Sequence, residues 1–109
     1  MVPMTTDRLF RVGQIVYHLR YRYRGVVVGC DPTCQADEAW YTSQIKGKGY
    51  RPTQSQPWYH VLVDGSGSQT YVAQQNLEPG DSGRPIDHPM IRHFFAAFRN
   101  GCYHEPTWN

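Results

Sequence analysis

The segment "QPWYHVLVDGSGSQTYVAQQNLEP", residues 56–79, decides the fold class. Two runs within it, at 58–64 and 69–73, are rich in β-branched and aromatic residues, as is typical of strands. The "DGSG" between them tolerates positive φ, so we predict that the two strands form a hairpin. The segment has aromatic side chains to pack and no catalytic set, and we therefore interpret it as scaffold.

Two more strands are predicted before this hairpin, "FRVGQIVYHL" at 10–19 and "YRGVVVGC" at 23–30, joined by a tight turn. Gly25 and Gly29 flank the valines and indicate bends or bulges. Residues 74–78 are a weak fifth strand, unless "NLEPG" ends the sheet as one helical turn. Short strands with glycine-marked bends predict a mainly β fold, a small half-open barrel of SH3-like type over about 10–79.

Residues 31–56 form a long connection between the second and third strands. A connection of this length is usually functional or partly ordered by itself. Its "ADEAWYTSQI" part, 36–45, is compatible with a short helix, and the following "KGKGYRP" is flexible, basic and aromatic.

The C-terminal part has a different period. Four apolar residues follow the i, i+3, i+4, i+7 spacing of one helical face: Ile91, Phe94, Phe95 and Phe98. Pro89 suits a first turn and Gly101 suits a stop, so we predict a C-terminal α-helix over about 88–100. Its aromatic face packs on the barrel or, alternatively, on a second copy of the chain, which would make the helix a site of self-association.

The 109 residues are enough for one domain, 1–109, and their 39% hydrophobic content allows a packed core. No run approaches the roughly 20 apolar residues of a membrane helix. The first ten residues lack the basic-then-apolar order of a signal peptide, and an odd count of three cysteines argues against a secreted disulfide framework. We expect a cytoplasmic protein with reduced thiols and no membrane contact.

The net charge of +2 is unevenly distributed. Residues 1–51 carry eight basic against four acidic residues, and residues 52–109 carry three basic against five acidic. The first part therefore offers a basic face to phosphate. The pI of 8.5 lies below the value above about 9 expected of a dedicated nucleic-acid-binding domain.

The run "RYRYR", 20–24, interleaves arginines and tyrosines. In an extended strand the arginines would share one face, where they can bridge phosphates, and the tyrosines would share the other, where they can stack on bases. The alternative is a hairpin tip at which Tyr23 packs inward and the arginines are merely solvated. With "KGKGYR", 46–51, the candidate DNA-binding residues, expected on one side of the molecule, are Arg20, Arg22, Arg24, Lys46, Lys48, Arg51, Tyr21 and Tyr50.

A cleft of aromatic residues is a further possibility, formed by Trp40, Tyr41, Trp58 and Tyr59. Adjacent strand residues point to opposite faces, so one of Trp58 and Tyr59 is core and the other is exposed or covered by the long connection. Structural roles are favoured for most of these rings.

The sequence favours neither a metal site nor an enzyme. Cys30 and Cys34 have an allowed zinc spacing, but a single residue between Cys102 and His104 gives them poor geometry for a closed site. No Ser or Cys lies near a His and an acid in a nucleophile pattern, and no glycine-rich phosphate loop is present. We expect no cofactor and no catalytic residue.

Four blocks, "VGQIVYH", "YRGVVVGCDP", "PWYHVLVD" and "TYVAQQNLEP", occur in this order. Together they resemble the YccV-like family of hemimethylated-DNA-binding proteins, also called the heat-shock protein HspQ family. "DEAW" in the long connection and the "HP" of residues 88–89 look closer to the version of this domain appended to some F-box proteins.

The resemblance implies a small barrel without catalytic residues that binds hemimethylated DNA. For some members it implies instead a protein-interaction role, as an adaptor or modulator of stress-linked proteolysis that contacts a protease or its substrate. Family members often carry Gly at the position of Arg22, and positive φ there would cost about 1 kcal/mol for a non-glycine residue. The residues matching the family's structural motifs are Tyr23, Gly25, Asp31, Pro32, Trp58, Tyr59, His60, Tyr71, Asn76 and Leu77.

Overall fold

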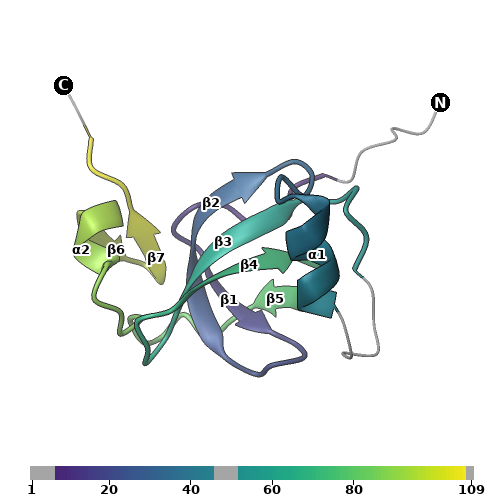
Figure 1. Cartoon of the computed structure of the whole chain (residues 1–109). Helices are drawn as coiled ribbons and strands as arrows, with labels where there is room; N and C mark the ends of the chain where they lie inside the picture. Colours follow the sequence, from purple (N-terminus) through teal and green to yellow (C-terminus); the bar gives the residue numbers. More distant parts are fainter. Residues whose placement is uncertain (1–6, 46–51, 108–109) are drawn as a thin grey trace.

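The computed structural model describes residues 7–45 and 52–107. The fold is mainly β, with one five-stranded antiparallel sheet in the order β4-β3-β2-β1-β5 and a separate β6-β7 hairpin (Figure 1). The strands are β1 (Ile15–His18), β2 (Arg24–Asp31), β3 (Trp58–Val63), β4 (Gln69–Ala73), β5 (Leu77–Pro79), β6 (Ala97–Arg99) and β7 (Cys102–His104). The helices are α1 (Glu38–Ile45), the 3₁₀ helix η1 (Gln74–Asn76) and α2 (Ile91–Phe94).

Both predicted hairpins and the helix in the long connection are confirmed. β3 and β4 pair with Trp58 opposite Ala73, and Gly65 in the turn has a φ of 75°. The register of β2 shifts between Val27 and Gly29, which is the bulge that the glycines indicated. At Gly25 a side chain would lie 2.6 Å from the carbonyl oxygen of Leu62, so the close approach of β2 to β3 requires glycine.

Side chains on both faces of the sheet are buried, and most of them belong to two clusters. Tyr59 and Val61 belong to the first cluster, and Leu62, their neighbour in β3, belongs to the second. Complete burial of a Val or Leu side chain contributes about 1.5–3 kcal/mol, so these central strands supply much of the stability. The first cluster contains Phe10, Val16, Val27, Tyr59, Val61, Val72 and Leu77, and the second contains Ile15, Val26, Leu62, Ile86, Phe95 and Tyr103.

The strand order leaves β4 and β5 as the two edges of the sheet, so the sheet is not closed by pairing within the described residues. The SH3-like form of the barrel therefore stays a prediction. A fifth strand and a single helical turn were the alternatives for residues 74–80, and the structure has both. The 3₁₀ helix η1 makes one turn, and β5 follows it and pairs with β1. No helix in the described part of the chain is long and apolar enough to cross a membrane.

The predicted C-terminal helix over 88–100 is wrong. Only Ile91–Phe94 is helical; Phe95 is extended, and β6 and β7 follow as a hairpin. Asn100 and Gly101 have φ values of 53° and 76°, as a two-residue turn of type I′ requires, and Asn-Gly is a strong signal for that turn. Self-association was predicted through the aromatic face of this helix, and that face does not form because most of the segment is not helical.

The helical spacing of the phenylalanines predicted a helix wrongly, because Phe95 and Phe98 reach the core from an extended chain. Phe95 is buried with its ring centre 5.1 Å from that of Tyr103, and the ring centre of Phe98 lies 4.6 Å from the same tyrosine ring. The hairpin is tied to the main sheet by the Tyr103 N–H, which donates to the carbonyl oxygen of Gly13 at 2.8 Å. It lies with α2 at the opposite end of the molecule from α1 (Figure 1).

Candidate nucleic-acid interface

The turn between β1 and β2, residues 19–22, carries two of the candidate arginines, and we call it the basic turn. The His18 N–H donates to the carbonyl oxygen of Tyr23, and the Arg22 N–H donates to that of His18, each at 2.8 Å. Nδ1 of the buried His18 side chain accepts hydrogen bonds from the backbone N–H groups of Arg20 and Tyr21, at 3.1 and 3.0 Å. The imidazole therefore fixes the shape of the basic turn from inside.

Arg22 has a φ of 57°, so the position does require the left-handed conformation that the comparison with a family glycine suggested. A non-glycine residue there costs about 1 kcal/mol. Arg20 and Arg22 are exposed, and Tyr21 between them keeps 51% of its surface in solvent. Residues 20–22 belong to the turn, so the arginines do not share one strand face as an extended run would require.

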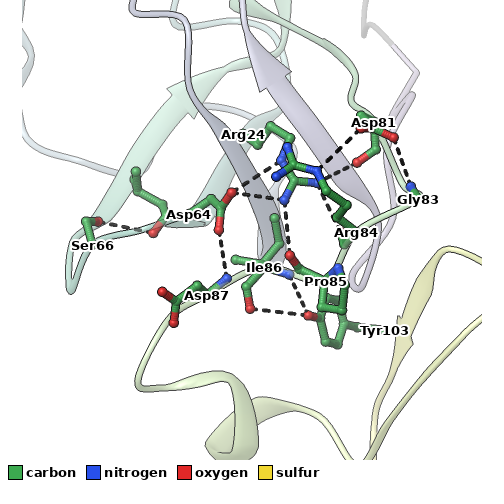
Figure 2. A network of polar contacts seen from close by, with 11 residues as sticks. Arg24, Asp64, Ser66, Asp81, Gly83, Arg84, Pro85, Ile86, Asp87 and Tyr103 are labelled. Carbon is green, nitrogen blue, oxygen red and sulfur yellow. Dashed lines mark hydrogen bonds and ion pairs between the residues drawn. The ribbon is translucent and has the colours of Figure 1, made fainter.

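Arg24, the first residue of β2, has a different environment (Figure 2). Its Nε and Nη2 donate to Oδ2 of Asp64 at 3.3 and 2.9 Å. Its Nη1 donates to the carbonyl oxygens of Asp81 and Arg84 at 2.6 and 3.0 Å, and Nη2 donates to that of Pro85 at 3.0 Å. These contacts use all five N–H groups of the guanidinium, so we take Arg24 out of the candidate interface.

Asp64 completes this network. Burial raises the pKa of its carboxyl group, but the hydrogen bond from the Asp87 N–H at 2.7 Å and the contacts with Arg24 lower it more, so the pKa lies below its ordinary value. The carboxylate is therefore ionised at neutral pH and pairs with Arg24. Together the two side chains fasten residues 81–87 to the ends of β2 and β3.

A groove of about 580 Å³ lies beside the basic turn. Trp58, at its floor, is buried with Tyr41 and Ala73, and its ring centre is 5.3 Å from that of Tyr71. Trp40 meets Trp58 and Tyr71 edge-on at 6.2 and 5.6 Å. We call this the aromatic groove; its aromatic residues are Tyr21, Tyr23, Trp40, Tyr41, Trp58 and Tyr71, with His18 and His60.

Helix α1 supplies one wall of the aromatic groove. Asp37 begins the helix as its N-cap, because its Oδ1 accepts a hydrogen bond from the Trp40 N–H at 2.8 Å. Tyr41 of α1 is buried against Trp58, which confirms that the long connection covers one of the two adjacent β3 aromatics. Tyr59, the other, faces the first core cluster, and its hydroxyl contacts Gln74 Oε1 at 2.5 Å.

Three of the family-motif residues form a polar edge to the groove. The Tyr71 hydroxyl donates to Oδ2 of Asp31 at 2.7 Å, and Nε2 of His60 lies 3.3 Å from the same oxygen. The rings of His60 and Tyr71 lie 4.6 Å apart. Burial, followed by the bond to Asp31, raises the pKa of Tyr71 far above its ordinary value, so this hydroxyl keeps its proton and acts as a fixed donor.

A family model described as "Hemimethylated DNA-binding protein YccV like" matches residues 8–102. The chain belongs to the YccV-like family. The resemblance carried by the four sequence blocks is thereby confirmed, and the family is one of DNA-binding domains rather than of enzymes.

Curated relatives of this YccV-like chain include F-box only protein 21 from Homo sapiens, which is 35% identical over 97 residues, and the Mus musculus protein of the same name, which is 34% identical. Each match covers 89% of this chain. The chain spans about 15% of the length of these relatives.

The remaining motif residues of the YccV-like chain hold the turns and the core. The Tyr23 hydroxyl lies 2.8 Å from Oγ1 of Thr70, and the carbonyl oxygen of Asn76 accepts a hydrogen bond from the Leu19 N–H at 2.9 Å. Leu77 is buried in the first cluster, and Pro32 is exposed. Tyr23 and Leu77 thus make these contacts through their side chains, Asn76 makes its contact through the backbone, and the structural roles of all three stay predictions.

The second basic-aromatic segment of the YccV-like chain, with Lys46, Lys48, Tyr50 and Arg51, lies outside the described residues. That all the candidate residues share one side of the molecule therefore stays a prediction. Among those that the structure describes, Arg20, Tyr21 and Arg22 are brought together and Arg24 is not.

The three cysteines are free thiols. Burial raises the pKa of Cys30, and Sγ of Cys102 accepts a hydrogen bond from Nη2 of Arg11 at 3.3 Å. Within residues 7–45 and 52–107, no three His, Cys, Asp or Glu side chains gather as metal ligands would.

Sequence reasoning missed another cavity in this YccV-like chain, which is lined by arginines and has a volume of about 470 Å³. Arg8 and Arg11 line it together with Asn100 and Cys102, so it forms only where the N-terminal segment meets the C-terminal hairpin. No local sequence signal reports such a meeting of distant segments, because its members are about 90 residues apart.

Proposed function

We propose that this chain is a non-enzymatic DNA-binding module that contacts the phosphate backbone through Arg20 and Arg22 and prefers hemimethylated sites. The observation that carries the proposal is the basic turn, which presents two exposed arginines beside an exposed tyrosine in a member of a DNA-binding family. Arginine pairs with phosphate oxygens through two parallel hydrogen bonds, so it suits this contact better than lysine.

Phosphate contacts of this kind position a protein on DNA without reading sequence. The backbone of the basic turn is held by His18, but Arg20 and Arg22 themselves are exposed. Base reading needs side chains that are held rigidly against base edges, so we expect weak sequence discrimination. A methyl mark is sensed by an apolar contact, and Tyr21, between the two arginines, is the exposed ring nearest to the bound backbone.

The test is a fluorescence anisotropy titration with three duplexes of one sequence that carry a methyl mark on neither, one or both strands. We expect all three to bind, the hemimethylated duplex most tightly, and the affinity to fall steeply between about 50 and 200 mM salt. Equal affinity for the three duplexes contradicts the preference for hemimethylated DNA. Affinity that does not change with salt contradicts the phosphate contact.

A protein-interaction module is the second candidate, as an adaptor or modulator of stress-linked proteolysis that meets a protease or its substrate. The observation in its favour is the aromatic groove, since none of the described residues that line it is Asp, Glu, Lys or Arg. Aromatic and uncharged surfaces are enriched at protein interfaces. Binding of a protein partner that persists at high salt, with no measurable DNA affinity, would favour this function over DNA binding.

A further inference from the structure

We propose that the aromatic groove receives one unpaired nucleobase of the bound DNA while Arg20 and Arg22 hold the neighbouring phosphates. The inference rests on the proposed DNA-binding function and adds to it a class of ligand, a base outside the helical stack. It follows from three properties of the groove: its ring surfaces, the lack of Asp, Glu, Lys and Arg among its described lining residues, and its place beside the basic turn.

The groove offers ring faces at several depths. Trp58 is buried at the floor, Trp40 and Tyr71 are half-buried, and Tyr21 at the mouth is half exposed. Stacking on an aromatic side chain strengthens the binding of a base, and every base has a face that can stack. The volume of about 580 Å³ falls in the usual range for a small-ligand pocket of about 300–1,000 Å³.

The polar groups of the groove suit the edge of a base. Gln44 and Gln69 line it, and their side-chain amides have no hydrogen-bond partner within the described residues. A side-chain amide offers a donor and an acceptor side by side, the combination that also pairs with adenine in DNA recognition. A phosphate, by contrast, would find no Lys or Arg among the described groove residues.

The base and the phosphates of a nucleotide would contact different parts of this surface. Tyr21 lines the groove, and its neighbours in the chain, Arg20 and Arg22, are exposed on the basic turn. A nucleotide whose base enters the groove therefore leaves its phosphates at the turn. An aromatic pocket without Lys or Arg among its described residues matches a base, and the cationic turn matches phosphate, so the pair favours nucleic acid over an uncharged peptide.

The base has to be unpaired because ring faces are hidden inside a duplex. A paired base shows only its edges, and extrusion from an intact stack costs a few kcal/mol. The cost is smallest for a bulged, mismatched or single-stranded base. We therefore expect this chain to bind a duplex with one bulged thymine at least about fivefold more tightly than the matched duplex, which corresponds to about 1 kcal/mol.

The experiment uses the intrinsic fluorescence of the groove. The chain has three tryptophans, and Trp108→Phe leaves Trp40 and Trp58 as the only tryptophans, both in the groove, whose emission is excited selectively over that of tyrosine. Three duplexes are titrated: matched, with one bulged thymine, and with an abasic residue at the bulge. We expect the bulged thymine to quench the emission and tighten binding, and the matched and abasic duplexes to bind, as anisotropy reports, without comparable quenching.

Matched variants locate the base. Tyr21→Ala and Leu19→Ala both change exposed side chains of the basic turn, 51% and 45% exposed, but only Tyr21 lines the groove. We expect Tyr21→Ala and Trp40→Ala both to remove the fivefold preference. In Trp40→Ala, whose substitution lies on α1 outside the basic turn, the affinity for the matched duplex should stay within about twofold. Leu19→Ala should keep both. Urea unfolding confirms that each variant is folded.

The outcomes separate this inference from the proposed function. Equal affinity and equal quenching for the bulged and abasic duplexes overturn the base-binding groove, while measured salt-dependent duplex binding leaves the DNA-binding function intact. If no duplex binds at any salt concentration, the DNA-binding function itself fails. A preference for the bulge that survives both Tyr21→Ala and Trp40→Ala places the base elsewhere and contradicts the inference.

Discussion

Arg22 and Arg24 are separated by one residue, yet their side chains have opposite surroundings. Arg24 is 10% exposed, and its five N–H groups donate to Asp64 and to three carbonyl oxygens. Arg22 is exposed, in a backbone conformation that a non-glycine residue rarely adopts, and its guanidinium has no partner among the described residues. The difference shows that a run of arginines does not act as one patch.

The cause lies in the carbonyl groups that the chain brings near each residue. Residues 81–85 cross the start of β2 without strand partners, so their carbonyl oxygens need donors, and the Arg24 guanidinium provides them. Arg22 lies outside the sheet, at the end of a turn whose backbone groups are already bonded to His18. Arg24 therefore stabilises the fold, and Arg22 is available for a ligand.

The largest effect that tests this contrast is the loss of stability in Arg24→Ala. Removal of one partner from a mostly buried ion pair, together with three hydrogen bonds to carbonyl groups, should lower the free energy of unfolding by about 2–4 kcal/mol. Urea denaturation measures it. Arg22→Ala, the matched control, should change stability by less than about 0.5 kcal/mol. Similar losses in the two variants would show that the contrast is false.

A smaller effect should appear in acid. The folded pKa of Asp64 is depressed, so its stabilising contribution is present above the unfolded pKa of about 3.9 and is lost as the pH falls through the folded pKa. Asp64→Asn should lower the free energy of unfolding at pH 7 by about 1–2 kcal/mol. Urea denaturation from pH 7 down to about pH 2.5 should show a shallower acid loss in this variant than in the wild type. Parallel plots of unfolding free energy against pH for the two proteins would contradict the stabilising role of ionised Asp64.

The smallest effect concerns the backbone of the basic turn. Arg22→Gly relieves the positive φ and should raise the free energy of unfolding by up to about 1 kcal/mol relative to Arg22→Ala, which removes the same charge but keeps the strain. Thermal unfolding of the two variants isolates the backbone term. We expect both variants to weaken DNA binding equally, because both lose the same guanidinium. Higher stability of Arg22→Gly than of Arg22→Ala would then indicate that the strained backbone is retained at a position used for DNA binding. Equal stability of the two variants removes that interpretation.

Local sequence signals predicted the parts of the fold that depend on neighbours in the chain. The hairpin at 56–79 followed from strand propensity and the turn glycines, and the bulge followed from Gly29. The positive φ of Arg22 was anticipated from the family glycine at that position. Each of these features is decided by a few adjacent residues, and that is why sequence alone sufficed.

Features that depend on distant segments were not predictable in the same way. The spacing of Phe94, Phe95 and Phe98 fits a helix and also fits an extended chain folded over Tyr103, and the Asn100–Gly101 turn was the deciding signal. The engagement of Arg24 depends on residues 81–85, nearly 60 positions away. The aromatic groove likewise joins α1 to β3 and β4, and only packing of the whole chain reveals it.

The central claim is that the basic turn carries the phosphate contacts. The most direct measurement is the dependence of log Kd on log salt concentration for three proteins: the wild type, Arg20→Ala/Arg22→Ala, and Arg92→Ala/Arg99→Ala. The last variant removes two exposed arginines from α2 and β6, outside the basic turn. The account predicts that the slope falls in magnitude by about two in the first variant and is unchanged in the second. Equal changes in the two variants, or an unchanged slope in the first, would contradict it.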